Sequence, residues 1–228
     1  MLHGSVITVH HLNHSRSQRV LWLLEELEIP YEIVKYERDP KTMLAPPSLQ
    51  KIHPLGKSPV ITDGSATIAE SGNILEYLVD TYGQGRLLPP RGTAEYRNYR
   101  YFMHYAEGSL MPYLLLKLIF DKIRTAPVPF FVKPLVKKIS GKVTGDFVLP
   151  NLTRHLKFLA DHLATNKWFA GAELSAADIQ MSYAIEAIVA RGKDLEVSPR
   201  IFDLAKRMSE RPAYKRALER GGPQSFDL

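Results

Sequence analysis

Hydrophobic positions in the first part of the chain switch from strand spacing to helix spacing and back. β-Branched residues at 6–9 predict a strand, which the polar stretch 11–17 should end. Apolar residues then recur at i, i+3, i+4 and i+7 over 20–27, and Ile29-Pro30 marks the end of this helix. A second strand is expected over 31–36, so the helix would join two parallel strands in a βαβ unit.

Turn-forming residues interrupt this pattern after the second strand. Four prolines between 38 and 57 predict an irregular loop with at most a short helical turn. Two short apolar runs, 59–62 and 66–68, flank Asp63-Gly64, which favours an antiparallel hairpin. Ser71 can cap a following helix that ends at Gly83. The first part of the chain therefore reads βαβ, loop, ββα.

The second part of the chain shows helical periodicity and no convincing strand. Residues 87–92 form a Pro- and Gly-containing linker, which predicts one domain at 1–86 and an all-helical domain at 93–228. Helices are expected near 94–118, 147–164, 176–191 and 199–219. In the third of these, Ser175 and Asp178 form a capping arrangement that has a structural role.

Residues 125–145 are an exception to this pattern. They hold three prolines, two phenylalanines and four lysines, which makes them a basic amphipathic segment. A solvated linker is the favoured interpretation of this segment. Docking to a membrane surface is the alternative, because phenylalanines and lysines suit such a surface.

The amino-acid composition limits the classes of protein and of reaction that fit this chain. The 228 residues are 45% hydrophobic, enough for a substantial core, and no apolar run approaches the roughly 18 residues of a membrane span. The N-terminal stretch lacks the pattern of a secretory signal, so a cytoplasmic location is expected. Without any cysteine, sulfur chemistry must come from a bound small molecule. The net charge of +6 favours anionic partners, but no base-stacking motif supports nucleic-acid binding.

Ser15 stands where the first strand meets the first helix. Backbone N–H groups and the positive end of the helix dipole point at whatever binds there, so the position favours an anion. An isolated serine at such a turn usually only caps the helix. The neighbouring His10 and His11 point to opposite faces of the strand and have no carboxylate cluster beside them, so we expect no metal site.

Three motifs in sequence order carry a resemblance to a known family. Ser15-Arg16-Ser17-Gln18-Arg19, the stretch from His53 to Pro59, and Glu70-Ser71 follow the order seen in the cytosolic glutathione transferases. The chain resembles this family over nearly its whole length, and most closely the serine-type enzymes. Within these it is similar to a branch from yeast and bacteria that has a His-Ser-Arg turn and a Glu-Gly-Ser-Leu stretch like residues 107–110. The resemblance implies a thioredoxin-like glutathione-binding domain followed by a helical-bundle domain, that is, α/β plus all-α.

The resemblance also implies a role for Ser15. In serine-type members the matching hydroxyl donates a hydrogen bond to the sulfur of glutathione and stabilises the thiolate, which is the nucleophile. Arg16 could pair with a glutathione carboxylate or with the thiolate. A tyrosine mechanism does not fit, since histidines stand near the end of the first strand, and the cysteine-based mechanism of other relatives is excluded by composition.

Further residues are assigned to glutathione by resemblance. Glu70 and Ser71 match the pair that holds the γ-glutamyl group, and Ser58-Pro59 matches the position before a cis-proline whose backbone pairs with the cysteinyl part. Relatives often have valine where this chain has Ser58. Lys57 is preferred over His53 as the partner of the glycine carboxylate.

The second substrate is expected to lie against the long aromatic-rich helix that starts the helical domain. By resemblance, His104, Tyr105 and Met111 are assigned to its apolar pocket. The expected function is conjugation of the thiolate to an electrophile in detoxification, or reduction of an organic hydroperoxide, by a homodimer. The alternative is a noncatalytic glutathione-transferase-like binding or assembly module.

Overall fold

A four-stranded mixed sheet forms the first part of the molecule. The computed structural model describes residues 6–223, apart from the side chain of Lys193. Strand β1 (Ile7–Leu12) lies parallel to β2 (Tyr31–Tyr36) and antiparallel to β3 (Val60–Asp63), which pairs with β4 (Ala66–Ala69), giving the order β2-β1-β3-β4. The predicted βαβ-ββα order is confirmed.

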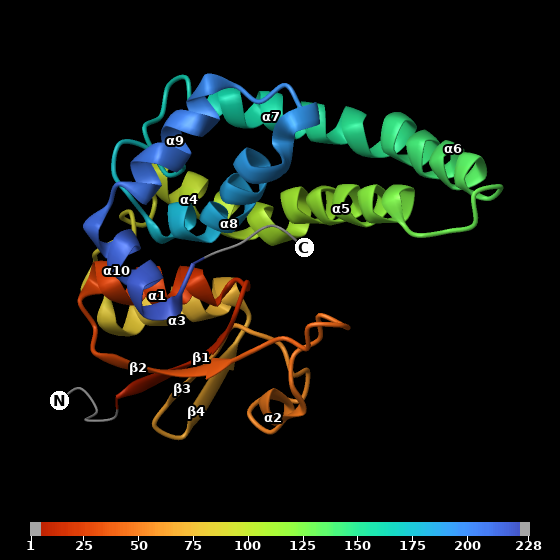
Figure 1. Ribbon diagram of the computed structural model, residues 1–228. Coiled ribbons are helices and arrows are strands. Elements are labelled where there is room, and N and C mark those ends of the chain that lie inside the picture. Colours follow the sequence, from red (N-terminus) through yellow and green to blue (C-terminus); the bar gives the residue numbers. More distant parts are fainter. Residues whose placement is uncertain (1–5, 224–228) are drawn as a thin grey trace.

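Helices cover this sheet mainly on one side. Helices α1 (Ser17–Leu27) and α3 (Ser71–Tyr82) lie between the sheet and the helical part of the molecule, and the short α2 (Pro47–Gln50) lies on the other side (Figure 1). The helical part holds α4 (Ala94–Tyr105), α5 (Met111–Thr125), α6 (Lys133–Val143), α7 (Leu149–His162), α8 (Ala176–Arg191), α9 (Pro199–Ser209) and α10 (Pro212–Gly221). No strand occurs in it between residues 94 and 223.

Two π-helical turns join neighbouring helices without a break. The first, Ala106–Leu110, connects α4 to α5, and the second, Thr144–Val148, connects α6 to α7. The helix expected over 94–118 therefore continues to Thr125. The segment at 125–145 is not a solvated linker, because most of it folds into α6. Figure 1 shows α5 and α6 as a hairpin that reaches away from the rest of the molecule.

Three other boundaries differ from the prediction. β1 extends through His10 and His11 to Leu12, because these residues pair with 34–36 of β2 despite their polarity. The helix expected over 199–219 is divided, since Pro212 forces Arg211 into an extended conformation. Ser71 is not the cap of α3: the cap position is Glu70, and Ser71 is the first helical residue.

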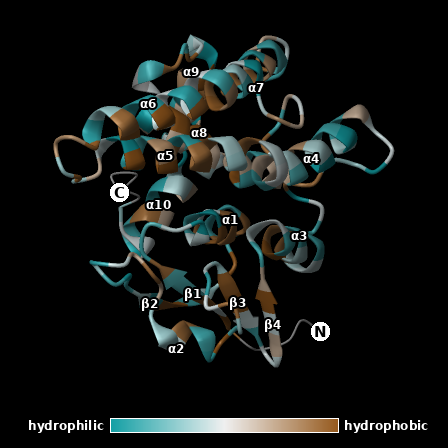
Figure 2. Ribbon diagram, turned by 90° about the vertical axis from the view of Figure 1, so that its right-hand side faces the viewer, coloured by the Kyte–Doolittle hydropathy of each residue, from teal (hydrophilic) through white to brown (hydrophobic). Residues whose placement is uncertain are grey.

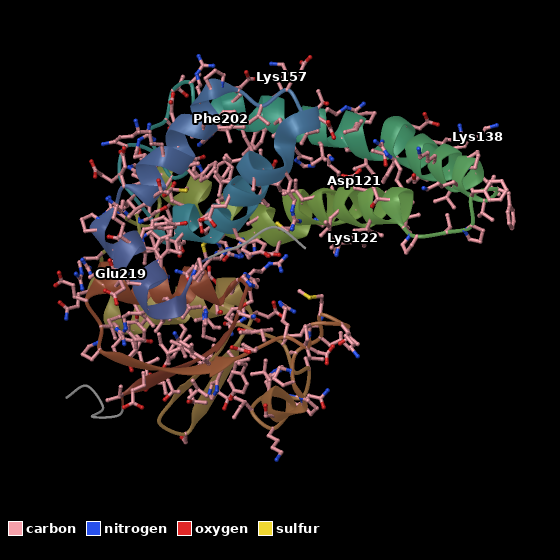
Figure 3. All side chains as sticks on the ribbon, viewed as in Figure 1. Asp121, Lys122, Lys138, Lys157, Phe202 and Glu219 are labelled. Atoms are coloured by element: carbon pink, nitrogen blue, oxygen red, sulfur yellow. The ribbon has the colours of Figure 1, made fainter. Side chains whose placement is uncertain are left out.

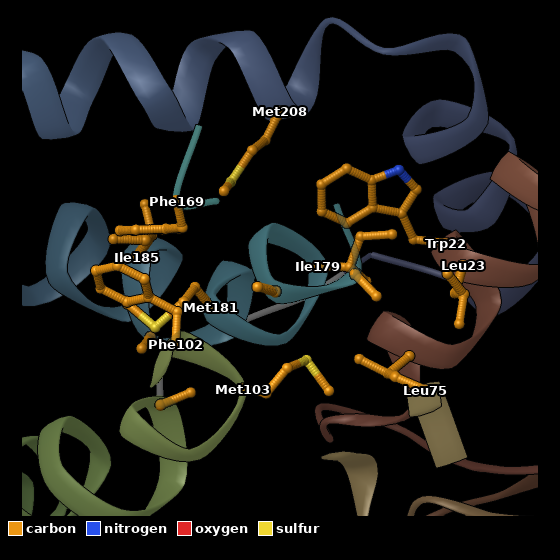
Figure 4. Close-up of a cluster of buried hydrophobic side chains, with 14 of the residues drawn as sticks. Trp22, Leu23, Leu75, Phe102, Met103, Phe169, Ile179, Met181, Ile185 and Met208 are labelled. Carbon is orange, nitrogen blue, oxygen red and sulfur yellow. The ribbon is translucent and has the colours of Figure 1, made fainter. Parts of the chain in front are cut away.

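One continuous hydrophobic core links the sheet part to the helical part. Trp22 and Leu75, from the helices on the sheet, lie close to Met103 and Ile179 from the helical part (Figure 4). Helix α8 runs through the middle of the helical part and is largely hydrophobic (Figure 2). Its first turn carries the predicted capping box, in which Ser175 and Asp178 bond each other's backbone. This shared core fixes the two parts relative to each other.

The C-terminal helix α10 returns to the first helix. Arg211 pairs with Glu26, and Arg216 and Arg220 both pair with Glu25. Gly221 packs so closely on α1 that an added Cβ would meet the side chains of Leu21 and Gln18 at 2.5 and 2.7 Å. Across residues 6–223, no helix is both long and apolar enough to cross a membrane.

Candidate active site

The turn between β1 and α1 holds a chain of hydrogen-bonded hydroxyl groups. Ser15 is buried, and its Oγ lies 2.7 Å from Oγ of Ser17, which in turn lies 2.8 Å from Nδ1 of His11. Ser15 Oγ also lies 3.4 Å from Oγ of Ser58, and Ser58 donates to the carbonyl of His10. These contacts place Ser15 directly behind the loop that contains Ser58.

The protonation of His11 sets the direction of this chain. Burial lowers the pKa of His11 to about 4, so the ring is neutral at pH 7. His11 also makes a hydrogen bond with the backbone of Gly221 that raises its pKa, so the ring donates there. Nδ1 is therefore an acceptor for Ser17, and the Ser17 oxygen is left to accept from Ser15. In this arrangement Ser17, at 2.7 Å, and Ser58, at 3.4 Å, can both accept the Ser15 proton, and Ser17 is the nearer.

A pocket of about 230 Å³ opens beside this turn. The residues predicted to bind glutathione all line it, together with His53, Leu55, Ala69 and Glu107: Arg16, Lys57, Ser58, Pro59, Glu70 and Ser71. The Ser58–Pro59 peptide bond is cis. The structure thus brings together three segments that are far apart in sequence.

Glu70 and Ser71 meet the pocket at the N-terminus of α3. Glu70 has a φ of 71°, a conformation that costs a residue other than glycine on the order of 1 kcal/mol. Arg19 donates to Oγ of Ser71 at 3.2 Å. Because an arginine can only donate, Ser71 accepts this bond and keeps its own hydroxyl proton for an acceptor in the pocket.

A single carboxylate holds two arginines at the wall of the pocket. Oε1 of Glu107 accepts from Nε of Arg16 at 2.8 Å and from Nη1 of Arg19 at 2.6 Å. Both guanidinium groups also lie over the ring of Tyr183, at 4.9 and 5.4 Å from its centroid. Burial alone would raise the pKa of Glu107, but Arg19 and Arg16 hold it below its usual value, so the carboxylate is ionised.

Arg19, Glu107 and Tyr183 had no assigned role in the sequence-based prediction. Arg19 is only 1% exposed, and the available signal was a charged residue directly before the apolar run 20–24. Glu107 lies in the π-helical turn between α4 and α5. Such turns occur frequently at functional sites, but their position cannot be read from hydrophobic spacing.

A second pocket, of about 200 Å³, adjoins the first and shares Arg16 with it. Met111, predicted to contact the second substrate, lines this pocket. His104 and Tyr105, assigned to the same role, do not: they lie at a separate pocket that has no lining residue in common with these two. Tyr105 points toward α7, where its hydroxyl lies 2.6 Å from Nδ1 of His155.

The described residues contain no cluster of His, Cys, Asp or Glu side chains suited to a metal ion. The two pockets present a helix N-terminus, hydroxyl groups, the carboxylates of Glu70 and Glu107, and arginine side chains. This combination binds and stabilises anions.

Comparison with known proteins identifies the class. Family models for the N-terminal and the C-terminal domain of glutathione S-transferase match residues 15–81 and 123–220. Glutathione S-transferase 3 of Schizosaccharomyces pombe is 35% identical over 215 residues, covering 94% of this chain and 88% of that protein. Glutathione S-transferase 1 of Saccharomyces cerevisiae is 34% identical over 188 residues, covering 79% and 80%. The chain belongs to the glutathione S-transferase family, and the resemblance to its yeast branch is confirmed.

Solved structures share the fold of this chain. A glutathione S-transferase from Actinobacillus pleuropneumoniae has a TM-score of 0.71 and 27% identity, covering 95% of this chain and 93% of that one. A family member from Pseudomonas fluorescens, solved with two glutathione molecules bound, has a TM-score of 0.73 and 24% identity, covering 96% and 95%. The predicted fold class, thioredoxin-like followed by all-helical, is confirmed.

Proposed function

We propose that this protein is a serine-type glutathione transferase, in which the 230 Å³ pocket holds glutathione and the adjoining pocket holds the second substrate. The observation that carries the proposal is the meeting of Arg16, Ser58-Pro59 and Glu70-Ser71 in one pocket in front of Ser15. The intact set favours a catalytic enzyme over a noncatalytic binding module.

Each residue of the first pocket has a chemical group that suits one part of glutathione. Glu70 pairs with the γ-glutamyl ammonium, and the N–H and hydroxyl of Ser71 donate to the adjacent carboxylate at the start of α3. The backbone at Ser58 and Pro59 pairs with the cysteinyl segment like an added strand. Lys57 pairs with the glycine carboxylate at the open end of the pocket.

Ser15 is the proposed stabiliser of the thiolate. Lowering a thiol pKa by two units from about 8.5 requires about 2.7 kcal/mol. A hydrogen bond to a charged group supplies roughly 1.5–3 kcal/mol, and the N-terminus of a helix adds about 0.3–1 kcal/mol. The Ser15 hydroxyl must turn from Ser17 toward the sulfur to make this bond. Arg16, at the boundary of the two pockets, adds a positive charge nearby.

The products of such a thiolate are conjugates of electrophiles, or alcohols from organic hydroperoxides. We propose a detoxifying role of this kind for a cytoplasmic homodimer, with residues 1–86 as the glutathione-binding domain and 93–228 as the domain of the second substrate. Met111 is the part of the earlier substrate-pocket prediction that we retain.

The test measures the pKa of glutathione bound to the protein, from the ultraviolet absorbance of the thiolate as a function of pH. Ser15→Ala should raise this pKa by about 1–2 units and lower conjugation of an activated aryl halide, while glutathione affinity changes little. Ser209→Ala, which removes a hydroxyl from an exposed turn of α9, is the matched control. An unchanged thiol pKa in Ser15→Ala would contradict the serine-type mechanism, and wild-type protein that does not bind glutathione would contradict the whole proposal.

A further inference from the structure

The pocket for the second substrate combines an apolar floor with a cationic rim. Its apolar side chains come mainly from one face of α5 and from the loop after β2: Met43, Met111, Leu114, Leu115 and Leu118. Its cationic side chains are Arg16, Arg38 and Arg191, and His14 lies beside them. Within the described part of the chain, no acidic residue lines this pocket.

Among the described residues, the guanidinium of Arg38 hydrogen-bonds only to backbone carbonyl groups. Its Nε donates to the carbonyl of Asn13 at 3.2 Å and its Nη1 to the carbonyl of Met43 at 2.9 Å. Both partners are neutral, and none of the ion pairs formed among residues 6–223 includes Arg38. Burial lowers the pKa of Arg38; Tyr183 opposes this, and the nearby charge of Arg16 lowers the pKa further.

Arg16 does not cancel this excess charge. Arg16 contacts the carboxylate of Glu107, which also pairs with the buried Arg19. One negative charge therefore neutralises only part of two positive charges. The rim between the two pockets therefore carries a net positive charge that is partly shielded from water. A cationic site of this kind raises the affinity for an anion and leaves a neutral molecule of the same shape unaffected.

We propose that the second substrate of this enzyme carries a carboxylate, or a similar anionic group, on an apolar body. The apolar body lies against α5, and the anionic group lies at the rim near Arg38, away from the glutathione pocket. This inference rests on the proposed function, because it assigns a substrate class to the same pair of pockets.

The test compares two aryl halides that react with the glutathione thiolate in the same way. One is 1-chloro-2,4-dinitrobenzene, which is neutral, and the other is 4-chloro-3-nitrobenzoate, which is an anion. In both, sulfur displaces chloride from the ring, and the thiol proton leaves to solvent. The quantity compared between variants is the ratio of kcat/KM for the anion to kcat/KM for the neutral halide.

Arg38→Gln should lower this ratio about 10-fold relative to wild type, and Arg38→Lys should retain most of it. Lys157→Gln, which removes an exposed charge from α7 outside the pocket, is the control and should leave the ratio unchanged. An unchanged ratio in Arg38→Gln would overturn the inference while activity toward the neutral halide still supports the proposed function. Binding of 3-nitrobenzoate, which does not react with glutathione, tests the pocket without conjugation. Arg38→Gln should weaken this binding.

A second, independent feature is the α5–α6 hairpin, residues 111–143, which we call the arm. Figure 1 shows it extending beyond the rest of the molecule, with the turn between the two helices at its far end. Phe130 and Phe131 in this turn are 85% and 71% exposed. The arm also exposes Leu115, Ile119, Ile123, Leu135 and Ile139. It thus holds seven of the fifteen exposed large hydrophobic side chains among the described residues.

The positive charge of the arm favours a negatively charged partner for this apolar surface. Residues 111–143 contain seven lysine or arginine residues and one aspartate, so the arm accounts for a charge equal to the whole chain's +6. Lys117 and Lys142 are paired with aspartates, whereas Lys122, Lys133, Lys137 and Lys138 form no ion pair with a described residue. Lys122 and Lys138 extend outward on the two helices (Figure 3).

The geometry points to an anionic lipid surface as the occupant: Phe130 and Phe131 insert among the headgroups, and the lysines contact lipid phosphate and carboxylate groups. An attraction of this kind weakens when salt screens the charges. This proposal replaces the solvated linker favoured from the sequence. The sequence alone did not reveal that both phenylalanines are exposed at the end of a protruding hairpin.

The experiment is sedimentation of the protein with vesicles. Wild type should bind vesicles containing phosphatidylserine, bind less in high salt, and remain in solution with vesicles of phosphatidylcholine alone. The double variant Phe130→Ser/Phe131→Ser should lose at least 10-fold in affinity, whereas Phe202→Ser, at an exposed position on α9, should not. Failure of the wild type to bind anionic vesicles would overturn the inference. A change of oligomeric mass in the double variant would also overturn it, since a second copy of the chain would then cover the arm.

Discussion

Arg19 lies in the interior of the protein with its Nη1 atom 2.6 Å from Oε1 of Glu107, and this contact joins the first helix to the turn between α4 and α5. The pair connects the proposed glutathione pocket to the helical part of the molecule. Burial lowers the pKa of Arg19 and Glu107 opposes this, so each charge is stabilised chiefly by the other. The stability of the site therefore depends on the pair staying intact.

Removing one member of this pair should be costly. Glu107→Gln keeps the shape of the side chain but leaves Arg19 buried without a counter-charge, so the free energy of unfolding should fall by about 3 kcal/mol. Urea denaturation measures the change. Glu219→Gln, at an exposed position of α10, is the control and should stay within about 0.5 kcal/mol of wild type. Equal stability of both variants would show that Arg19 is neutralised by another group.

Lys57 and His53 both line the proposed glutathione pocket, and they allow a direct comparison. Lys57→Gln should weaken glutathione binding about 5-fold, since a charge-assisted contact at an exposed position contributes about 1 kcal/mol. His53→Gln should have little effect, because Nδ1 of His53 already accepts from the backbone of Leu55. Calorimetric titration with glutathione gives both constants. A larger loss in His53→Gln would reverse the assignment of the glycine carboxylate.

Glu186 should make stability depend on pH. Burial raises the pKa of Glu186 to about 7, and the hydrogen bond from Tyr214 opposes this only partly. A carboxyl group with a raised pKa stabilises the fold fully below its unfolded pKa of about 4.5, and this contribution is lost as pH rises through 7. Glu186→Gln removes the titration. We expect the variant to match wild type at pH 4.5 and to unfold at a higher temperature than wild type at pH 8, as measured by thermal denaturation.

Asp178 stabilises the start of α8 through three hydrogen bonds. Its carboxylate accepts from the backbone N–H groups of Phe169 and Ser175 and from the Ser175 hydroxyl. Asp178→Ala should lower the free energy of unfolding by about 3 kcal/mol, because it removes the cap and leaves buried N–H groups without partners. Asp178→Asn, which keeps one acceptor oxygen, should lose less. Denaturation that shows equal losses for the two variants would mean that packing around residue 178 matters more than its hydrogen bonds.

The sequence predicted the elements whose spacing is regular. The βαβ-ββα order followed from the alternation at 6–9 and 31–36, the helical spacing at 20–27 and the Asp63-Gly64 turn. The predicted ends of two elements were wrong, because strand pairing or a proline outweighed the local sequence preference. His10 and His11 joined β1 because β2 offered hydrogen bonds, and Pro212 divided the last predicted helix.

Only those site residues that belong to a recognisable sequence motif could be predicted. Residues within motifs, such as Arg16 and Glu70, proved to line one pocket. The π-helical turn at 106–110 inserts an extra residue and changes the rotation of α5 relative to α4, so helical spacing does not place His104 and Tyr105 relative to Met111. Arg38 and Tyr183 reach the second pocket from a loop and from α8, and nothing in their local sequence indicates this.

The contact between Gly221 and His11 has a consequence for the order in which the protein can mature. His11 orients Ser17 and, through it, Ser15, and His11 is itself bonded to the backbone of Gly221. On the ribosome, the roughly 200 residues between these partners take on the order of 10–40 s to synthesise. The sheet can form during that time, but the hydroxyl chain at its edge gains its final orientation only when α10 emerges and docks on α1. On the proposed mechanism, a nascent chain would therefore form its sheet well before Ser15 could act on a thiol.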